Sequence, residues 1–196
     1  MQHLDAKYWN NRYLEHTTGW DLGEVSPPLK AYIDQLEDKS IRILIPGCGN
    51  SYEASYLLEK GFTDITVIDL APALTVSLQQ KFPSEIYPTL KILNGDFFEL
   101  EDKFDLVLEQ TFFCALEPSL RQPYAEKMNS LLAPGGKIAG VLFNREFEGG
   151  PPFGGNEKEY RNIFQKYFQI NILAQCYNSI EARSGSEVFI EFEKTT

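Results

Sequence analysis

Residues 41–51 read IRILIPGCGNS, a short apolar run that leads directly into a glycine-containing turn. The run is typical of a buried strand, and it precedes a predicted helix over residues 52–60 that Gly61 is well placed to end. Glycine permits positive φ angles and a close approach to the backbone, so a cofactor can lie against Gly47 and Gly49 at the start of the helix. An ordinary tight turn has the same pattern, so other parts of the sequence are needed to distinguish the two.

Predicted strands and helices alternate along most of the chain. Ser26 is a predicted N-cap, with proline in the first turn of the helix that follows. Further strands are expected at residues 65–69, 90–93, 104–109 and 137–143, and further helices from residue 72, over residues 119–132 with a closing turn at 133–136, and over residues 157–168. Residues 170–177 and 187–192 are expected to close the sheet as an antiparallel pair. This order predicts an α/β fold, a doubly wound and mostly parallel sheet of about seven strands with helices on both faces.

The size and composition fit a single domain. The chain has 196 residues, of which 43% are hydrophobic and 23% are charged, as in globular proteins. No apolar run is long enough to cross a bilayer, and residues 1–16 do not resemble a signal peptide, which favours a cytoplasmic protein with no membrane partner. The net charge of −10 argues against nucleic acid, because phosphate backbones are held by clustered Lys and Arg. A small molecule is the favoured partner, and we expect a monomer or a weak homodimer.

The cysteines and histidines do not favour metal chemistry. Cys48, Cys114 and Cys176 are far apart and form no C-x-x-C pair, so neither a disulfide framework nor a structural zinc site is expected. The only histidines, His3 and His16, both lie near the N-terminus and do not support a histidine-based metal centre. We therefore expect reduced thiols and no bound metal.

A carboxylate follows the glycine turn at a distance that suits a nucleoside. Asp69 ends the second predicted strand, 22 residues after Gly47, where it can accept hydrogen bonds from both hydroxyls of a ribose. The alternative role for Asp69 is an N-cap of the helix that Pro72 opens. A dinucleotide fingerprint would place another glycine at position 52, where this chain has Tyr52. The sequence therefore favours an adenosyl cofactor over NAD.

Several short motifs occur in an order typical of one enzyme family. They are YW at residues 8–9, WDLG at 20–23, PGCG at 46–49, VID at 67–69, GDFF at 95–98, TFFCAL at 111–116, LAPGG at 132–136 and GGPPF at 149–153. In these motifs the chain resembles the class I S-adenosylmethionine methyltransferases and, more narrowly, the thiopurine S-methyltransferase-like superfamily. Within it, the chain is most similar to the thiol, thiocyanate and halide methyltransferases. The resemblance implies one methyltransferase domain over residues 1–196, with an N-terminal helical cap at 1–24 and a Rossmann-like core at 25–196.

The resemblance also implies contacts with the adenosyl half of S-adenosylmethionine, whose product is S-adenosylhomocysteine. Gly47 and Gly49 would lie under the cofactor, and Asp69 and the adjacent Leu70 would hold the ribose. Asp96 would accept a hydrogen bond from the adenine amino group, and the backbone of Phe97 would read the ring. A turn aspartate after residues 94–95 is the alternative for Asp96.

The remaining implied contacts involve the cap and the end of the fourth strand. Trp9, Tyr13 and Trp20 would come from the cap, and Trp9 and Tyr13 share one helix face because they are four residues apart. Core packing is the alternative for these aromatic side chains. Gln110 lies where the family contacts the methionine portion of the cofactor, and related sequences often have an aromatic residue or a cation there. Glu109 is an alternative partner for the methionine ammonium group.

The proposed chemistry is an in-line displacement of a methyl group from a sulfonium. A neutral hydroxyl or amine acceptor usually needs a base, most often histidine, and neither His3 nor His16 lies at a strand end. This favours an acceptor that is already anionic and soft, such as a thiolate, thiocyanate, iodide or bisulfide, although a carboxylate base would serve as well. The candidate acceptor pocket consists of Phe112, Phe113, Phe143, Phe153 and the anion-attracting Arg145, for which core burial and a solvated loop arginine are the alternatives.

Two other functions remain open from the sequence. A non-catalytic scaffold would bind the adenosyl cofactor and transfer no methyl group. A nicotinamide-dependent oxidoreductase is disfavoured by Tyr52.

Overall fold

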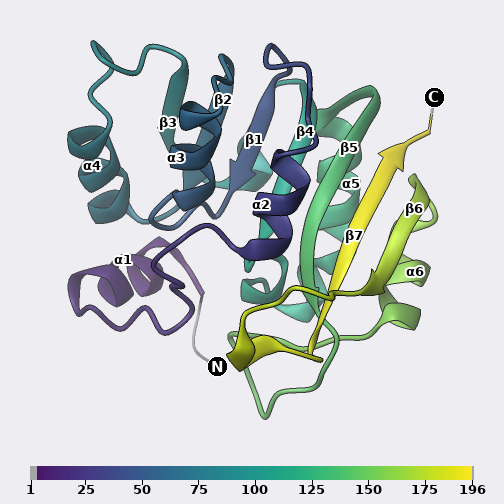
Figure 1. The fold of residues 1–196 in the computed structure, drawn as a ribbon. Helices are drawn as coiled ribbons and strands as arrows, with labels where there is room; N and C mark the ends of the chain where they lie inside the picture. Colours follow the sequence, from purple (N-terminus) through teal and green to yellow (C-terminus); the bar gives the residue numbers. More distant parts are fainter. Residues whose placement is uncertain (1–3, 196) are drawn as a thin grey trace.

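Seven strands form one sheet in the computed structural model, which describes residues 4–195 (Figure 1). The strands lie in the order β3-β2-β1-β4-β5-β7-β6. Their bounds are β1 Ile43–Pro46, β2 Ile65–Asp69, β3 Leu90–Asn94, β4 Phe104–Gln110, β5 Leu132–Phe143, β6 Phe168–Gln175 and β7 Glu187–Lys194. The strands β1 to β5 pair in parallel, whereas β7 runs antiparallel between β5 and β6. The predicted doubly wound, mostly parallel sheet with a closing antiparallel pair is confirmed.

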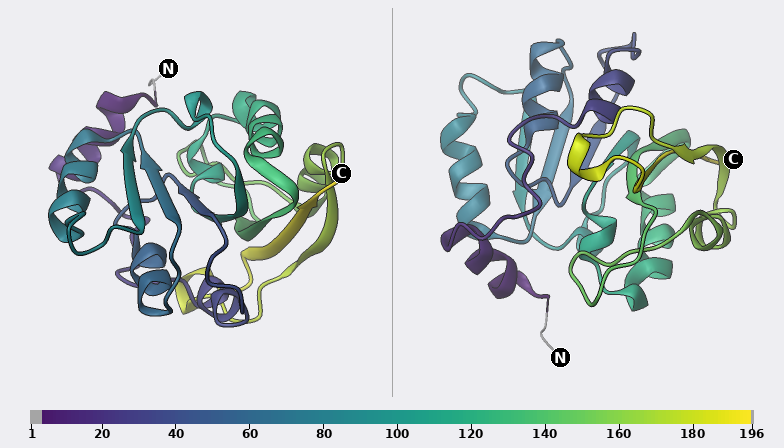
Figure 2. Two further views of the ribbon diagram at one scale, coloured as in Figure 1. Left: turned by 90° about the horizontal axis from the view of Figure 1, so that it is seen from above. Right: turned by 60° about the horizontal axis from the view of Figure 1, so that its bottom comes forward.

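Helices cover both faces of this sheet. They are α1 Ala6–Leu14, α2 Pro27–Ile33, α3 Tyr52–Glu59, α4 Pro72–Lys81, α5 Arg121–Leu131 and α6 Glu157–Phe164. Short 3₁₀ helices are η1 Phe97–Glu99, η2 Phe113–Ala115, η3 Pro118–Leu120 and η4 Glu181–Arg183. Figure 2 shows α2 and α3 on one side of the sheet and α5 and α6 on the other, and a separate buried cluster lies under each pair. Among residues 4–195, no helix combines the length and the apolar character needed to span a bilayer.

The helix α1 forms the predicted N-terminal helical segment and packs against α4 (Figure 1). Residues 1–3 of the predicted cap, including His3, lie outside the described residues. Asn10 of α1 fastens the segment to the core, because its Oδ1 accepts a hydrogen bond of 2.7 Å from the backbone N–H of Ala73 at the start of α4. The helix α1 therefore sits beside the carboxyl end of β2, where α4 begins.

Three local predictions need correction. The helix expected over residues 119–132 begins as η3 and becomes α-helical only at Arg121. The turn expected at residues 133–136 is a bulge inside β5, since Leu132 pairs with Phe104 and Lys137 already pairs with Leu106. The helix expected over residues 157–168 ends at Phe164, because Phe168 is recruited into β6 beside β7.

Ser26 occupies the N-cap position of α2 without capping it. Its hydroxyl instead donates a hydrogen bond of 3.0 Å to Oε1 of Gln110 at the end of β4. A serine hydroxyl can accept a hydrogen bond from the N–H groups of a helix terminus, or it can bond to a side chain elsewhere. Here it donates to a side chain at the end of β4. This contact determines where the Gln110 side chain points.

Candidate functional site

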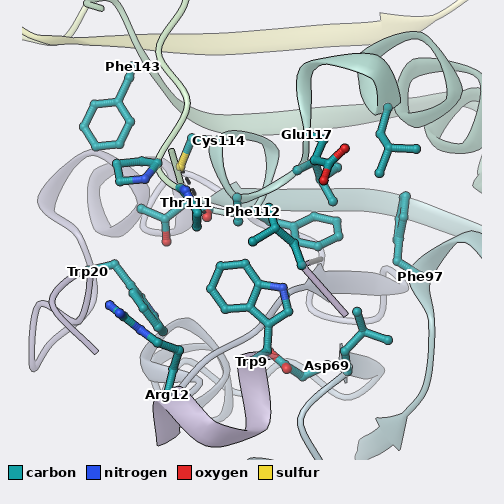
Figure 3. A pocket seen from close by; sticks show the side chains of 18 of the residues that line it. Trp9, Arg12, Trp20, Asp69, Phe97, Thr111, Phe112, Cys114, Glu117 and Phe143 are labelled. Carbon is teal, nitrogen blue, oxygen red and sulfur yellow. Dashed lines mark hydrogen bonds between the residues drawn. The ribbon is translucent and has the colours of Figure 1, made fainter. Parts of the chain in front are cut away.

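A cavity of about 700 Å³ lies at the carboxyl ends of the parallel strands, where ligands of such sheets bind. Five strand ends contribute to its wall, through Gly47, Asp69, Gly95, Thr111 and Phe143. The cap faces this wall with Trp9, Arg12 and Trp20 (Figure 3). The cavity therefore has a floor made by the sheet and a cover made by the N-terminal segment.

The glycine turn after β1 has the geometry that the sequence suggested. Gly47 and Gly49 have φ angles of +55° and +50°, in the left-handed region that favours glycine. A Cβ atom at Gly47 would lie 2.2 Å from the Phe112 ring, so steric space also requires glycine at this position. Gly47 lines the cavity and Gly49 does not. The turn thus brings the Gly47 backbone against the Phe112 ring on the cavity wall, where any larger residue would clash with that ring.

Asp69 ends β2 with its carboxylate on the cavity wall. Only 9% of the residue is exposed, and burial raises the pKa of its carboxyl above the usual value while backbone hydrogen bonds oppose the shift. These donors are the N–H groups of Ala71, at 2.9 Å, and Gly49, at 3.4 Å. The N-cap position of α4 belongs to Ala71. A buried carboxylate on the wall of an open cavity is suited to accept hydrogen bonds from a ligand.

The end of β3 supplies the next part of the wall. Asp96, Phe97 and Leu70 line the cavity together. Asp96 is the N-cap of η1, because its Oδ1 accepts a hydrogen bond of 2.8 Å from the N–H of Phe98. Asp96 therefore has the turn role that was the alternative to adenine recognition, and it also lines the cavity. Whether it also contacts adenine stays a prediction.

The aromatic residues of the cap form one cluster over the cavity. Trp20 stacks edge-to-face on Trp9 and on Tyr13, with ring centroids 5.5 Å and 5.9 Å apart. All three line the cavity. Arg183 ties the cluster to the core, since its guanidinium donates a hydrogen bond of 3.0 Å to the carbonyl of Trp20. The three side chains line the cavity, and Trp9 and Tyr13 also pack against the buried cluster of the core, so both roles expected from the sequence are present.

The end of β4 differs from the prediction. Glu109 and Gln110 are not among the residues that line the cavity. Glu109 is 1% exposed and accepts hydrogen bonds from the N–H groups of Phe112 and Phe113, at 2.9 Å each, and from the Tyr124 hydroxyl at 2.5 Å. Burial raises the pKa of Glu109 to about 7, against these hydrogen bonds. The Glu109 carboxylate thus stabilises the turn after β4 through hydrogen bonds on the side of the turn that faces the core.

The predicted acceptor residues divide into two groups. Phe112, Phe143 and Arg145 line the cavity. Phe113 is buried in the core among Tyr124, Tyr160 and Phe164. The ring of Phe153 packs on Gly150 and does not line the cavity.

Among the polar residues of the wall that sequence reasoning missed are Arg12, Cys114, Glu117 and Arg183. Arg12 lies three residues after Trp9 and therefore shares its helix face, which is a usable signal. Cys114 lies inside the TFFCAL motif, and burial raises the pKa of its thiol to about 12, so it is a neutral thiol near pH 7. Arg183 lies in the loop before β7, and nothing in a single sequence distinguishes it. Within residues 4–195, no group of His, Cys, Asp and Glu side chains is arranged to hold a metal ion.

The chain matches a known protein family over almost all of its length. The profile of the Thiopurine S-methyltransferase (TPMT) family matches residues 4–194. A probable thiol methyltransferase 2 from Arabidopsis thaliana is 32% identical over 161 residues, which are 79% of this chain and 70% of that protein. A thiopurine S-methyltransferase from Photobacterium profundum is 26% identical and a thiocyanate methyltransferase 1 from Brassica oleracea is 25% identical, over 82% and 95% of this chain and 83% and 84% of those proteins.

Solved structures share the fold at low sequence identity. A 1,6-didemethyltoxoflavin-N1-methyltransferase from Burkholderia thailandensis, solved with bound S-adenosylhomocysteine, is similar with a TM-score of 0.77. It is 17% identical, and the match covers 97% of this chain and 87% of that one. A glycopeptide N-methyltransferase complexed with S-adenosylhomocysteine gives a TM-score of 0.69 at 13% identity, over 84% and 87% of the two chains.

Proposed function

Since the chain belongs to the thiopurine S-methyltransferase family and is an S-adenosylmethionine-dependent methyltransferase, we propose that its acceptor is a small, soft, anionic nucleophile. The acceptor class comprises thiolates, thiopurine-like sulfur, thiocyanate and halides. The family assignment replaces the nicotinamide oxidoreductase that the sequence had left open.

The residues of the cavity fit the cofactor in three respects. Gly47 forms part of the cavity wall at a position where a Cβ would clash with Phe112, the buried carboxylate of Asp69 faces the cavity, and the aromatic cap covers both. When bound, S-adenosylmethionine supplies a methyl group on a positively charged sulfur. In this proposal Asp69 and Leu70 hold the ribose, Asp96 and Phe97 hold the adenine, and Trp9, Tyr13 and Trp20 exclude water from the methyl group.

The observation that carries the acceptor class is the composition of the wall on the Phe143 side. The Arg183 guanidinium lies 5.4 Å from the centroid of the Phe143 ring, and the Arg145 guanidinium lies 4.7 Å from that of Phe147. All four residues line the cavity; Arg183 is also paired with Glu187, whereas no ion pair joins Arg145 to a described carboxylate. Aromatic rings remove water from an incoming anion, and nearby guanidinium groups offset the loss of its hydration. A soft anion is the acceptor that gains most from this combination.

Apart from carboxylates such as Glu117, the titratable groups of the wall support the same acceptor class. His16 is exposed and is not among the residues that line the cavity. The thiol of Cys114 and the hydroxyl of Tyr13 both have raised pKa values, because burial disfavours their charged forms. Neither group is suited to take a proton from an acceptor near neutral pH. An acceptor that arrives as an anion needs no such group.

A transfer assay tests the proposal. Methyl-labelled S-adenosylmethionine is incubated with thiols, thiocyanate, halides, thiopurines and tellurite, and with a catechol and an amine as hard acceptors. We expect turnover of soft acceptors only, with the rate for a thiol rising as pH increases through the pKa of that thiol. Turnover of the catechol or the amine alone would overturn the acceptor class. Cofactor binding without turnover of any acceptor would favour the non-catalytic scaffold.

An arginine variant sharpens this assay. Arg145→Gln removes the charge beside Phe147 without breaking an ion pair among the described residues, and we expect it to raise the KM for thiocyanate severalfold through the lost charge-assisted contact. Arg161→Gln, at an exposed position of α6 outside the cavity, is the matched control. An unchanged KM for thiocyanate in Arg145→Gln would remove Arg145 from the acceptor site.

A further inference from the structure

Arg12 carries a cation into the cavity without a counter-ion. It lies on α1, lines the cavity and stacks on Trp20, with its guanidinium carbon 5.3 Å from the centroid of the indole ring. Its Nε atom is buried and has no hydrogen-bond partner among residues 4–195. No ion pair joins Arg12 to a described carboxylate. A buried guanidinium N–H without an acceptor is costly, so this group is suited to an anionic ligand.

The residues expected at the methionine end of the cofactor point elsewhere. The Gln110 side chain is held by the Ser26 hydroxyl at 3.0 Å, and it does not line the cavity. Both carboxylate oxygens of Glu109 accept hydrogen bonds on the core side of the turn. The end of β4 therefore offers the methionine carboxylate no cationic side chain.

Arg12 lies at the opposite end of the cavity from the adenosyl residues. In Figure 3, Arg12 and Trp20 appear on one side of Trp9, and Asp69 and Phe97 appear on the other. If the ribose binds at Asp69 and the adenine at Asp96 and Phe97, the side of the cavity that holds Arg12 is left for the amino-acid end of the cofactor. We propose that Arg12 binds the carboxylate of the methionine portion of S-adenosylmethionine and of S-adenosylhomocysteine. The proposal depends on the cofactor and not on the identity of the acceptor.

The chemistry of the side chain suits this role. A guanidinium presents its N–H donors in a planar fork that matches a carboxylate, and the unpaired Nε is part of that fork. Stacking on Trp20 restricts the side chain before the ligand arrives, which lowers the entropy lost on binding. The other arginines of the wall are placed differently, since Arg183 is bound to the Trp20 carbonyl and to Glu187, and Arg145 stacks on Phe147.

Because Arg12 belongs to the cap, the contact would also couple the cap to the cofactor. The cap is otherwise tied to the core through the side chains of Asn10 and Asp21 and through the Trp20 carbonyl. An ion pair between the ligand and Arg12 would add a further tie that exists only when the cofactor is present. Ligands without a carboxylate would leave the cap held by protein contacts alone.

Two ligands that differ in the amino-acid portion test the proposal by calorimetry. S-adenosylhomocysteine carries the carboxylate, and 5′-methylthioadenosine keeps the adenosyl thioether without it. We expect Arg12→Ala to weaken the binding of S-adenosylhomocysteine about tenfold or more, as for loss of a charge-assisted contact, and to change that of 5′-methylthioadenosine less than about twofold. Arg12→Lys should recover part of the loss, because it keeps the charge without the fork.

Lys7→Ala is the matched control, because Lys7 is an exposed cation of the same helix and does not line the cavity. It should leave both dissociation constants unchanged. An equal loss for the two ligands in Arg12→Ala would assign Arg12 to packing of the cap against Trp20 and would overturn the proposal. Unchanged binding of S-adenosylhomocysteine would overturn it as well. Thermal unfolding of each variant establishes that the compared proteins are folded.

Discussion

Two buried carboxylates at the ends of parallel strands have opposite orientations. Asp69 is the last residue of β2 and faces the cavity, whereas Glu109 is the penultimate residue of β4 and faces the core. Both accept backbone N–H groups, and burial raises the pKa of both. The comparison shows that a strand end alone does not bring an acid to a ligand site, since successive side chains of a strand point to opposite faces.

The partners of the two acids explain their different roles. Asp69 accepts from two N–H groups of neighbouring turns and remains on the cavity wall. Glu109 accepts from three donors, and two of them belong to the turn that carries Phe112. Thr111 in that turn has a φ angle of +57°, which is unfavourable for a β-branched residue and needs such support. One acid is therefore suited to bind, and the other shapes the wall by positioning Phe112.

Glu109→Ala should have the largest effect, and it acts on stability. The substitution leaves the N–H groups of Phe112 and Phe113 and the hydroxyl of Tyr124 without their acceptor. Each unpaired buried donor costs about 1–3 kcal/mol, so we expect the free energy of unfolding to fall by about 3 kcal/mol or more in urea titrations. Glu101→Ala, at an exposed position, is the control. If the free energy of unfolding falls by less than about 1 kcal/mol, Glu109 does not stabilise this turn.

The raised pKa of Glu109 predicts a pH dependence of stability. The pKa of Glu109 is raised to about 7 from an ordinary value of 4.5, so the folded protein holds this proton more tightly than the unfolded chain. The contribution of Glu109 to stability is complete below pH 4.5 and is lost as pH rises through about 7, by about 3 kcal/mol in total. Urea midpoints of the parent protein and Glu109→Gln, measured from pH 4.5 to 8, should diverge accordingly. Parallel curves would contradict the raised pKa.

Asp69→Ala should act on binding more than on stability. If its carboxylate accepts hydrogen bonds from the ribose, the loss of this acceptor weakens the binding of S-adenosylhomocysteine by about 1.5–3 kcal/mol. Calorimetry measures the effect, and circular dichroism establishes that the variant is folded. The same experiment on Glu109→Gln should give a smaller loss, because Glu109 reaches the cavity only through Phe112. Equal losses would remove the distinction between the two acids.

A spectroscopic signal of smaller size reports on the cap. Trp9 and Trp20 are the only tryptophans, and both line the cavity. Addition of S-adenosylhomocysteine should change their fluorescence, because the adenosyl group alters the surroundings of the indoles. In Asp69→Ala the same change should appear at higher ligand concentration. If the fluorescence of the parent protein does not change, Trp9 and Trp20 are packing residues that do not contact the cofactor.

The fold could be predicted well because its signals are local. The run at residues 41–51 combines an apolar strand with glycine φ angles that only a turn of this kind requires, and Gly61, with φ +84°, follows the last residues of α3. The boundaries failed where tertiary contacts override local preference. Phe168 continues a helical pattern and is nevertheless paired with Lys194 in the sheet. Residues 157–168 alone do not show that Phe168 will pair with Lys194, which lies 26 residues further along the chain.

The site was less predictable because it depends on which way side chains turn. In the sequence Asp69 was the candidate for the ribose and Glu109 an alternative partner for the methionine ammonium group, and the contacts with Tyr124 and with the turn at Thr111 direct Glu109 to the core. Gln110 was placed by a contact with Ser26, which lies 84 residues away along the chain. Arg12 shared a helix face with Trp9 and was recognisable in principle. Contacts between distant segments, and not residue types, decided most of the wall.

The inner position of β7 has a consequence for biosynthesis. This strand is the last one along the described chain, yet it separates β5 from β6 in the sheet. During vectorial synthesis β6 leaves the ribosome first and has no neighbour to pair with until residues 187–194 emerge. The edge of β5 stays open for the same period, as an unpaired template for intermolecular association. A nascent chain of this protein therefore exposes the unpaired edges of β5 and β6 until β7 emerges.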